Sequence, residues 1–591
     1  MSDKKALQSI IAADIGSTLT HVSLLELVEG TYRFVAHAET PSTIAEPDMD
    51  LMIGLVRAIK RLEYITQRAF LDEADELIQP GQVMGDGVDA FVATSSAAPP
   101  LRCILVGLTN DLSIESAHRG CAAANVLVTD TVILDRGTRR WDNRTLNRLH
   151  AAPPDLLLLV GGVDTGPVAP LENAAHVLSA VYEALRRERR PVVIFAGNQE
   201  ARRPVSDIMS PAFDFRVVDN VRPTVHTESL AELQRELADV YERVKLASLP
   251  GFRLLRRWCV APVLSSAEAF GNMLRYFARR NDLPQGVLGL DAGGMTTYVG
   301  AACGEQYHWS VTAESGSSYG TCRVLELAGA DQVRRWLPVA LTNEETVTRL
   351  ENARLRPRGI PQTREDLLLT HAVLREAVST AVRTMRHFWD LPEKGQDGGT
   401  MPVFDVIAAR GGPIVHTPED GMMVLTLLDA LQPTGLTRLV VDWASLWPQL
   451  GAIAGIAPLV AAQVLERDSF RELGTVISPV GVARDGDRAL DLKIIPERGK
   501  VVEARIPAGV VQCFPLPLEE HAIVEVRPSR EFDIGLGRKG MGGRAKVRGG
   551  SLGIVVDTRG RPLALPQNER QRLNKIQQWL GNLVGDADWT S

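Results

Sequence analysis

Cysteine and histidine are scarce in this sequence, and neither sign of charge dominates it. The eleven histidines show no metal-ligand spacing, and no nucleophilic triad can be argued from the chain. The six cysteines form no CxxC pair, so neither a zinc site nor an iron–sulfur site is indicated. The net charge of -7 and the pI near 6.0 give no reason to expect nucleic acid or an anionic membrane as a partner.

The beginning of the chain lacks the long apolar core of a signal peptide, so a reducing cytoplasm is the expected compartment. One charge-free stretch, from Trp443 to Leu465, is long enough to span a bilayer. Two prolines and two glutamines interrupt it, and it is rich in glycine and alanine rather than leucine and isoleucine. We therefore expect no membrane span here, but a buried helix whose small residues let another helix approach closely.

What the sequence does contain is an internal repeat. Ile11–Thr20 reads IAADIGSTLT: an apolar strand, an acid, a glycine and two hydroxyl residues, before a second apolar strand. Gly286–Gly300 reads GVLGLDAGGMTTYVG and repeats this pattern. Each copy continues through a third strand, a helix (about residues 50–78 and 363–388) and a closing strand. Two βββαβ units of matching order predict a duplicated α/β fold.

The rest of the chain divides into an insert between the repeats and a C-terminal part. Apolar strands that end in Gly, Asn or Asp alternate with helical stretches in the insert, which predicts a parallel sheet in a Rossmann-like domain. The C-terminal part has short strands with Pro and Gly, which predicts a small β-rich domain with a terminal helix. The predicted domains are 1–98 (completed by about 251–285), 99–250, 286–470 and 471–591.

The repeated turns combine the groups that bind a polyphosphate. Glycines let the backbone approach a ligand, and successive N–H groups at such a turn form an anion-binding concavity. Asp14 and Asp291 would repel phosphate directly, but they suit Mg²⁺ held largely through water. Two facing turns would clamp a Mg–polyphosphate, whereas one such turn alone is an ordinary polar hairpin. Gly411 and Gly412, which end a later strand, would let an adenine or ribose lie against the backbone, or form a plain strand-to-helix turn. The residues assigned to this site are Asp14, Gly16, Ser17, Thr18, Asp291, Gly293, Gly294, Thr296, Thr297, Gly411 and Gly412.

Two other features have both a functional and a structural interpretation. The strand ends Gly107–Asn110, Gly161–Gly166 and Gly197–Gln199 would converge on one edge of a parallel sheet, where α/β proteins bind ligands. An inert structural edge is the alternative. The stretch Gly535–Gly550 carries five cations and no acid. It could hold a phosphate-bearing partner or an acidic subunit surface, or it could be a solvated loop.

The two hairpins, followed by a strand that ends in two glycines, resemble the actin-like ATPase superfamily of actin, sugar kinases and Hsp70-type chaperones. The inserted stretches VGLTNDLSIESAHRGCAAAN, DLLLLVGGVDTGP and VVIFAGNQEARRPV are more specific. With IAADIGSTLT and LDAGGMTTYVGA, they make the chain similar to the GlmL family, also called glutamate mutase L or MutL. That family is unrelated to the mismatch-repair protein of the same name. The resemblance runs through most of residues 10–465.

This resemblance implies duplicated actin-like (ribonuclease H-like) lobes that close around Mg-ATP. It also implies an accessory protein of an adenosylcobalamin-dependent mutase, which uses ATP to eject damaged cobalamin by analogy with diol dehydratase reactivases. The implied cofactors are ATP and Mg²⁺, and the implied partner is a mutase subunit; a contact with cobalamin itself has no separate support in the sequence. A non-enzymatic scaffold with a vestigial cleft and a small-molecule kinase of the same fold are the alternatives.

The resemblance also suggests positions for catalysis and for the hinge between the lobes. Glu268 is the only acid in the first hinge helix, about residues 262–277, and stands where superfamily ATPases often orient the attacking water. A surface role is the alternative for this residue. The second hinge helix is expected at about residues 450–457, where Gly451 and Gly455 would permit a close helix crossing.

Two positions depart from the expected pattern. His21 stands where related proteins usually carry lysine after the first hairpin, and Tyr298 stands where aspartate often follows the paired threonines. These departures are compatible with nucleotide binding and predict that any hydrolysis is slow.

Overall fold

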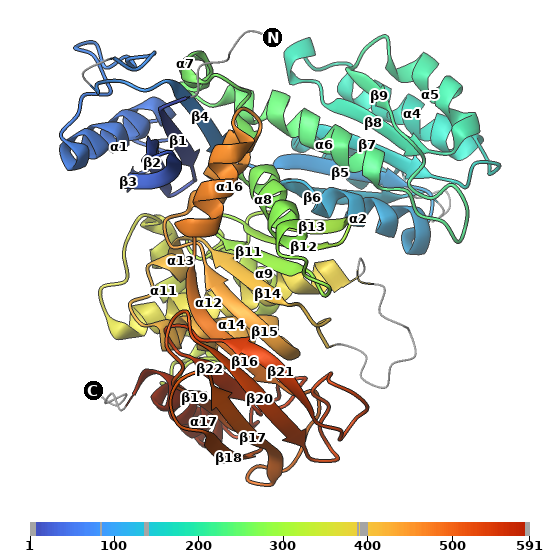
Figure 1. The fold of residues 1–591 in the computed structure, drawn as a ribbon. Helices are drawn as coiled ribbons and strands as arrows, with labels where there is room; N and C mark the ends of the chain where they lie inside the picture. The colour runs from blue at the N-terminus through green and yellow to red at the C-terminus, as the bar shows by residue number, and fades with distance from the viewer. Residues whose placement is uncertain (1–6, 83–84, 135–140, 387–388, 390–399, 586–591) are drawn as a thin grey trace. The chain divides into compact units, whose positions relative to one another are not determined.

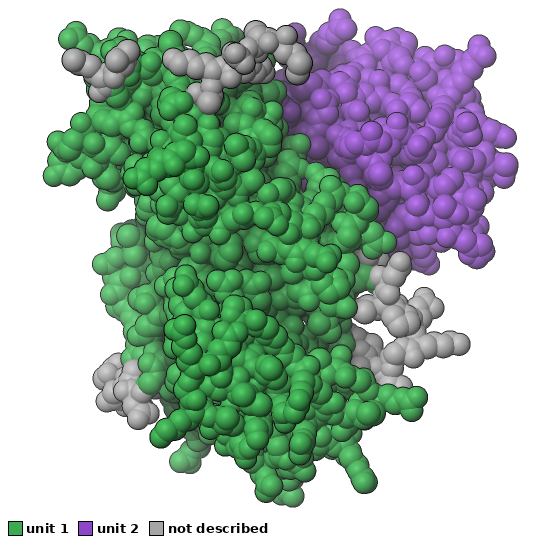
Figure 2. Space-filling view, in the orientation of Figure 1, with its two compact units in different colours: residues 1–97, 253–309, 314–591 green, residues 98–252, 310–313 purple. Residues whose placement is uncertain are grey.

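The computed structural model describes residues 7–82, 85–134, 141–386, 389 and 400–585 of the chain. The chain divides into two compact units, coloured separately in Figure 2. Unit 1 comprises residues 1–97, 253–309 and 314–591, and unit 2 comprises residues 98–252 with 310–313.

The first repeat of unit 1 is a five-stranded sheet with the order β10-β4-β1-β2-β3 (Figure 1). Strands β1 to β3 form an antiparallel meander, and β4 returns parallel to β1 after helix α1. Helix α1 ends well before the predicted residue 78, because Gln67 takes a left-handed conformation at its C-terminus. The elements are β1 (Ser9–Ile15), β2 (Leu19–Val28), β3 (Thr31–Pro41), α1 (Leu51–Thr66), β4 (Ala90–Ser95), α7 (Phe252–Trp258), β10 (Leu264–Ser265) and α8 (Ser266–Arg280).

The second repeat has the same order within an eight-stranded sheet, β13-β12-β11-β14-β15-β16-β22-β19. Strand β11 pairs antiparallel with β12 and parallel with β14, as β1 does with β2 and β4. The predicted pair of βββαβ units is therefore confirmed. The elements are β11 (Val287–Ala292), β12 (Thr297–Cys303), β13 (Gln306–Thr312), α9 (Thr321–Ala328), α10 (Ala330–Arg334), α11 (Asn343–Leu355), α12 (Arg364–Met385), β14 (Val406–Arg410), α13 (Gly412–Val415), α14 (Asp420–Leu431), β15 (Gly435–Val441), α15 (Leu446–Ala454) and α16 (Pro458–Arg467).

The C-terminal part contributes to two sheets. Three of its strands extend the sheet of the second repeat, so the predicted boundary at residue 471 does not separate one sheet from another. The other four form a separate antiparallel sheet of order β18-β17-β20-β21. The predicted terminal helix is present as α17. The elements are β16 (Arg471–Ser478), β17 (Arg488–Pro496), β18 (Val502–Pro507), β19 (Val511–Phe514), β20 (His521–Pro528), β21 (Gly543–Arg548), β22 (Ile554–Asp557) and α17 (Glu569–Val584).

Unit 2 is a five-stranded sheet in which every pairing is parallel, as the alternation of strands and helices predicted. Its order is β6-β5-β7-β8-β9. Strand β6 was not predicted, because polar residues interrupt its apolar pattern. The elements are β5 (Leu101–Gly107), α2 (Glu115–Ala122), β6 (Val126–Ile133), α3 (Asn143–Ala151), β7 (Leu156–Gly161), α4 (Ala169–Tyr182), β8 (Val192–Gly197), α5 (Arg202–Met209), β9 (Phe215–Val217) and α6 (Ala231–Val244).

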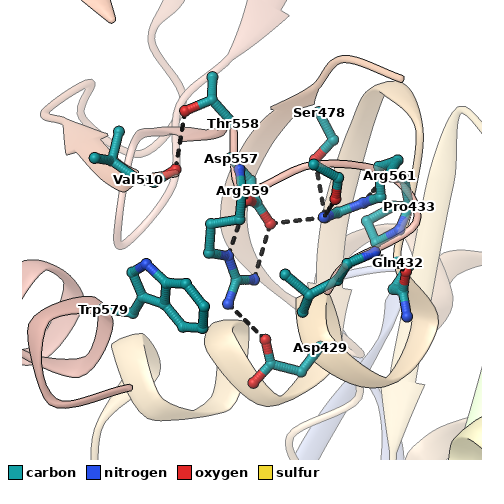
Figure 3. A network of polar contacts seen from close by, with 12 residues as sticks. Asp429, Gln432, Pro433, Ser478, Val510, Asp557, Thr558, Arg559, Arg561 and Trp579 are labelled. Carbon is teal, nitrogen blue, oxygen red and sulfur yellow. Dashed lines mark hydrogen bonds and ion pairs between the residues drawn. The ribbon is translucent and has the colours of Figure 1, made fainter. Parts of the chain in front are cut away.

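A network of buried ion pairs ties the C-terminal strands and α17 to α14 (Figure 3). Arg559 is fully buried, and its guanidinium donates to Asp557 at 2.9 Å and to Asp429 at 2.7 Å. Asp557 also accepts a 2.7 Å hydrogen bond from Arg561. The Arg559 guanidinium lies 4.7 Å from the ring centre of Trp579 on α17. Asp557 therefore contacts two buried arginines at the junction of these elements, and Asp429 supplies a second carboxylate to one of them.

The charge-free stretch forms two short helices, α15 and α16, instead of one. Within the described residues, no helix is both long enough and apolar enough to cross a membrane. Helix α15 crosses α8 closely, since a Cβ at Gly451 would overlap the backbone carbonyl of Ala269. The predicted crossing is confirmed at Gly451 and wrong at Gly455, which is exposed and lies beyond the crossing.

This crossing makes a matched pair of variants informative. Gly451→Ala is expected to lower the free energy of unfolding by about 1–3 kcal/mol, because two backbones must move apart. Gly455→Ala should leave it within about 0.5 kcal/mol, because the new methyl group meets only the carbonyl of its own helix, at 3.5 Å. Denaturant unfolding followed by near-UV circular dichroism measures both. Equal stability of the two variants would show that the close crossing does not exist.

Candidate functional site

The two repeated turns have the same backbone geometry. In the first, the N–H of Gly16 donates to the carbonyl of Leu19 at 2.9 Å, and in the second the N–H of Gly293 donates to that of Thr296 at 2.9 Å. The acid of each repeat lies two residues before that glycine, at Asp14 and Asp291. The sequence pattern therefore identified two structurally equivalent turns.

The two turns also touch each other. A Cβ at Gly294 would lie 2.6 Å from the Cγ2 atom of Thr18, so only glycine permits this approach. The Ser315–Gly320 segment covers the second turn, and its Ser317 and Ser318 N–H groups donate to the carbonyls of Gly293 and Gly294 at 3.1 and 3.0 Å. The sequence analysis missed this segment, although its run of glycine and serine was a usable signal.

Two hydroxyls of the covering segment, those of Ser315 and Ser318, are buried without a hydrogen-bond partner among the described residues. The hydroxyl of Ser318 is buried against Gly294 and has no hydrogen-bond partner among the described residues. A buried hydroxyl without a partner costs free energy, and such groups in native proteins often mark a missing ion or ligand. Ser318 therefore adds an unpaired hydroxyl to the place where Thr18 of one turn approaches Gly294 of the other.

Among the predicted hydroxyls, only that of Thr297 has a structural role that the described contacts show. Thr297 is fully buried and donates to the carbonyl of Ser315 at 2.8 Å, so it holds the covering segment in place. Ser17, Thr18 and Thr296 lie on the turns themselves. Binding by these three residues stays a prediction.

A buried arginine joins the two acids, and the sequence analysis did not anticipate it. Arg410, the last residue of β14, donates to Asp14 at 2.7 Å and to Asp291 at 3.0 Å. Its Nε lies 3.8 Å from a carboxylate oxygen of Asp442. Asp442 in turn accepts the backbone N–H groups of Leu446 and Trp447 at the start of α15. One guanidinium therefore connects both repeats to the start of α15.

The single positive charge of Arg410 does not balance the three carboxylates of Asp14, Asp291 and Asp442. Burial raises the pKa of Asp442 to about 7, although Arg410 and two backbone N–H groups act against this rise. Burial likewise raises the pKa of Asp291. Burial would also raise the pKa of Asp14, but Arg410 and a hydrogen bond from Ser266 more than offset it and the pKa is lowered. Asp14 is thus the one of these three carboxyls whose pKa is lowered.

The residues differ in how well they fit the predicted Mg²⁺. Asp14 is almost fully buried: one oxygen accepts from Thr94 at 2.8 Å and Ser266 at 2.6 Å, and the other accepts from Arg410. Both oxygens of Asp14 therefore already accept hydrogen bonds, and its predicted role in holding Mg²⁺ through water stays a prediction. Asp291 is partly exposed and uses only one oxygen among the described residues, so it fits a hydrated cation. No group of three or more acids, histidines or cysteines in the described part of the chain forms a metal site.

The two departures from the expected pattern occupy equivalent positions. His21 lies opposite Asp14 across β1 and β2, and Tyr298 lies opposite Asp291 across β11 and β12. Burial lowers the pKa of His21 to about 4, so this side chain is neutral at pH 7. Tyr298 exchanges a hydrogen bond with Tyr307, and burial raises its pKa well above the usual value. Neither residue supplies the charge of a lysine or an aspartate.

The remaining predicted site residues are placed by the same elements. Glu268 lies in the exposed first turn of α8, where its N–H is capped by Ser265, and its catalytic role stays a prediction. Gly411 has a φ of +108°, and a Cβ there would overlap the carbonyl of Ala292, so this glycine is required by the packing of β14 on β11. Gly412 has open space beside it, and binding of a base or ribose there is likewise untested.

The strand ends of unit 2 converge as predicted, but their polar groups pair with one another. Asn198 donates to the carbonyl of Gly166 at 2.7 Å. Asn220 donates to the carbonyl of Gly162 and to the Asp164 carboxylate, both at 2.9 Å. This arrangement favours the structural interpretation of that edge.

Comparisons with known proteins bear on these features. A family model described as MutL protein matches residues 10–469. A protein from Clostridium tetanomorphum named MutL is 23% identical over 445 residues, which covers 70% of this chain and 88% of that protein. Among solved structures, nucleotide-free acetone carboxylase overlaps 85% of this chain and 81% of its own, at 12% identity and a TM-score of 0.35. Nucleotide-free diol dehydratase-reactivating factor overlaps 76% of this chain and 99% of its own, at 11% identity and a TM-score of 0.30. These scores are low, so the description of the fold rests on the strand order given above.

Proposed function

The chain belongs to the MutL protein family, and we propose that it is an ATP-binding accessory protein that reactivates an adenosylcobalamin-dependent mutase. Support for the mutase comes from the family and its resemblance to glutamate mutase L. Support for the nucleotide comes from the meeting of two equivalent glycine turns around the unpaired hydroxyl of Ser318. A polyphosphate is the ligand whose oxygens would accept from these donors together.

Each residue of the site has a defined task in this proposal. Phosphate oxygens between the turns would accept from the backbone N–H groups and from the hydroxyls of Thr18 and Ser318. Arg410 keeps Asp14 neutralised, which reduces the repulsion between that carboxylate and the phosphates. Asp291 would hold Mg²⁺ through its waters, and the bound cation would shield phosphate charge. Entry of the phosphates would separate Thr18 from Gly294, and this separation would couple nucleotide binding to movement of the two repeats.

Ser318 provides the test of nucleotide binding. Calorimetry with ATP and Mg²⁺ should show a dissociation constant between micromolar and millimolar, or roughly -4 to -8 kcal/mol. Ser318→Ala should weaken binding about 3- to 10-fold, the cost of one net hydrogen bond. Ser529→Ala is the matched control, because its hydroxyl is also buried without a partner among the described residues but belongs to the C-terminal part. Equal ATP affinities in Ser318→Ala and Ser529→Ala would show that Ser318 does not contact the nucleotide. The absence of any binding heat in the wild type would show that the repeated turns do not bind ATP.

The scaffold alternative is favoured by one observation, the replacement of both expected charged groups by the neutral residues His21 and Tyr298. The two functions differ in their dependence on ATP. A reactivating protein should restore the activity of an inactivated mutase from the same organism only when ATP is present. A scaffold should bind that mutase equally with and without ATP, and should restore nothing.

A further inference from the structure

A cavity lies away from the repeated turns, between the eight-stranded sheet and the C-terminal four-stranded sheet. Its volume is about 710 Å³, which is in the range of small-molecule sites. Residues of β15 and β16 line one side, and residues of β21 and the preceding loop line the other. The basic stretch noted in the sequence thus ends in a strand that forms one wall of this cavity.

Two arginines on opposite walls are held by one buried acid. Glu472 on β16 is almost fully buried, and a single carboxylate oxygen contacts Arg438 on β15 and, at 3.5 Å, Arg548 on β21. The hydroxyl of Thr475 fixes the backbone of Arg548, donating to its carbonyl at 2.7 Å and accepting from its N–H at 3.3 Å. The two guanidinium groups are therefore preorganised before any ligand arrives.

This cluster is incompletely satisfied. The Nε atoms of Arg438 and Arg548 and the second oxygen of Glu472 are buried without hydrogen-bond partners among the described residues. One carboxylate serves two guanidinium groups, which leaves an excess positive charge. Lys546 also lines the cavity but pairs with Glu497 at 3.5 Å, and the acid on the cavity wall, Asp405, accepts a backbone N–H from Gln285 at 2.7 Å. The polar end of the cavity is therefore formed by two guanidinium groups that share one carboxylate; their Nε atoms are buried, so a ligand would meet the terminal nitrogens.

The rest of the lining is apolar. Ile534 and Val547 are buried members of the C-terminal core, and Leu436, Leu536 and Ala545 are partly buried against the same core. An apolar wall beside a cationic end suits a molecule that has both characters, because apolar area supplies affinity and guanidinium groups orient an anion bidentately.

We propose that this cavity binds a small molecule with a phosphate or carboxylate head on an apolar or aromatic body. The head lies at Arg438 and Arg548, and the body lies against Leu436, Ile534 and Val547. This site is separate from the repeated turns and does not depend on the nucleotide proposed to bind there.

The first probe is anilinonaphthalene sulfonate, an aromatic anion whose fluorescence rises in apolar surroundings. Titrations are made on the full chain with saturating ATP, so that the repeated turns are occupied. We expect one saturable site. Arg438→Gln and Arg548→Gln should each weaken it about tenfold, as expected for loss of a charge-assisted hydrogen bond. Arg505→Gln on β18 is the matched control and should bind normally, because that arginine lies outside the cavity and is paired with Asp491 at 3.3 Å.

A second variant tests the apolar wall without touching charge. Ala545→Phe should fill the cavity and abolish dye binding, and phenylalanine suits a strand, so folding should be preserved.

Phenyl phosphate and phenylpropionate then compete with the dye, and the stronger competitor identifies the head group. Unchanged dye affinity in Ala545→Phe would overturn the site. If Ala545→Phe lost dye binding while both arginine variants kept full dye affinity, the site would not recognise an anionic head group. Failure of both phenyl phosphate and phenylpropionate to displace the dye would lead to the same conclusion.

Discussion

Replacing Asp557 with asparagine is expected to lower the free energy of unfolding by about 3–5 kcal/mol, the usual cost of breaking a buried ion pair by removing one partner. Asparagine keeps the size of the side chain but removes its charge. Arg559 and Arg561 are almost completely buried, and both donate to Asp557. Arg559 would retain Asp429, whereas Arg561 would retain only neutral oxygens. The loss therefore reflects uncompensated guanidinium charge in the interior.

Lys493→Gln is the control for this variant. It breaks an ion pair with Glu503 on the exposed four-stranded sheet, and its effect should stay below about 1 kcal/mol because water solvates both charges. Denaturant unfolding is followed by tryptophan fluorescence, since Trp579 packs against Arg559. If Asp557→Asn were as stable as Lys493→Gln, the network in Figure 3 would contribute little to folding.

The pH dependence supplies a second signature of Asp557. Burial opposes ionisation of this carboxyl, but Arg559 and Arg561 lower its pKa well below the usual range. The folded state therefore holds fewer protons here than the unfolded state. Stability from this group is fully present above the ordinary aspartate pKa of about 3.9 and is lost as pH falls through the lower folded value. The difference between wild type and Asp557→Asn should be constant from pH 5 to 8 and should shrink only below about pH 4.

The sequence was sufficient to predict the repeated units and both turns. Alternating apolar strands and the shared spacing of acid, glycine and hydroxyl are local patterns, so each can be recognised without knowledge of tertiary contacts. The parallel sheet of unit 2 was predicted for the same reason, from strands that alternate with helices. Helix ends were less predictable: α1 stops at Gln67, and α15 ends before Pro458, which begins the next helix.

Contacts between distant segments could not be read from the sequence. Arg410 lies within the quoted motif IAARGGPIV, but nothing local indicates that it meets Asp14, which is 396 positions away. The hydroxyl of Ser318 gains its importance only where Thr18 approaches Gly294. The cavity around Arg438 and Arg548 likewise exists only because β15 and β21 belong to neighbouring sheets. Such features depend on tertiary packing, which local composition does not specify.

Arg410→Gln should affect both stability and nucleotide binding. It removes the guanidinium that contacts Asp14, Asp291 and Asp442, and should cost about 3–5 kcal/mol at pH 8. The positive charge of Arg410 lowers the pKa of all three carboxyls. Without it, the folded pKa of each carboxyl should be higher than in the wild type. The folded variant then binds more protons than its unfolded state. Its stability should be greatest at low pH and should be lost as pH rises from about 5 to 8, more steeply than in the wild type.

Two comparisons separate the charge of Arg410 from its shape. Arg410→Lys keeps the charge but cannot donate to Asp14 and Asp291 in the same bidentate manner, so an intermediate loss is expected. Arg383→Gln is the control, because Arg383 is an exposed residue of α12 whose guanidinium contacts only the hydroxyls of Ser379 and Thr380 among the described residues. Thermal unfolding at pH 5.5, 7 and 8 measures all three variants. A loss in Arg410→Gln that does not change with pH would mean that carboxylate repulsion is not its cause.

The same variant tests whether Arg410 prepares the repeated turns for phosphate. Without the guanidinium, ionised Asp14 and Asp291 lie beside the place where the turns meet, and a polyphosphate would encounter their uncompensated charge. Calorimetry at pH 8 should therefore show ATP affinity at least tenfold weaker, and part of it should return at pH 5.5, where the carboxyls are protonated. Mg²⁺ should also restore part of the affinity, since a cation held through water at Asp291 would replace some of the lost charge. Full ATP affinity in a folded Arg410→Gln protein at pH 8 would place the nucleotide away from these turns, and the arginine would then serve only to join the two repeats.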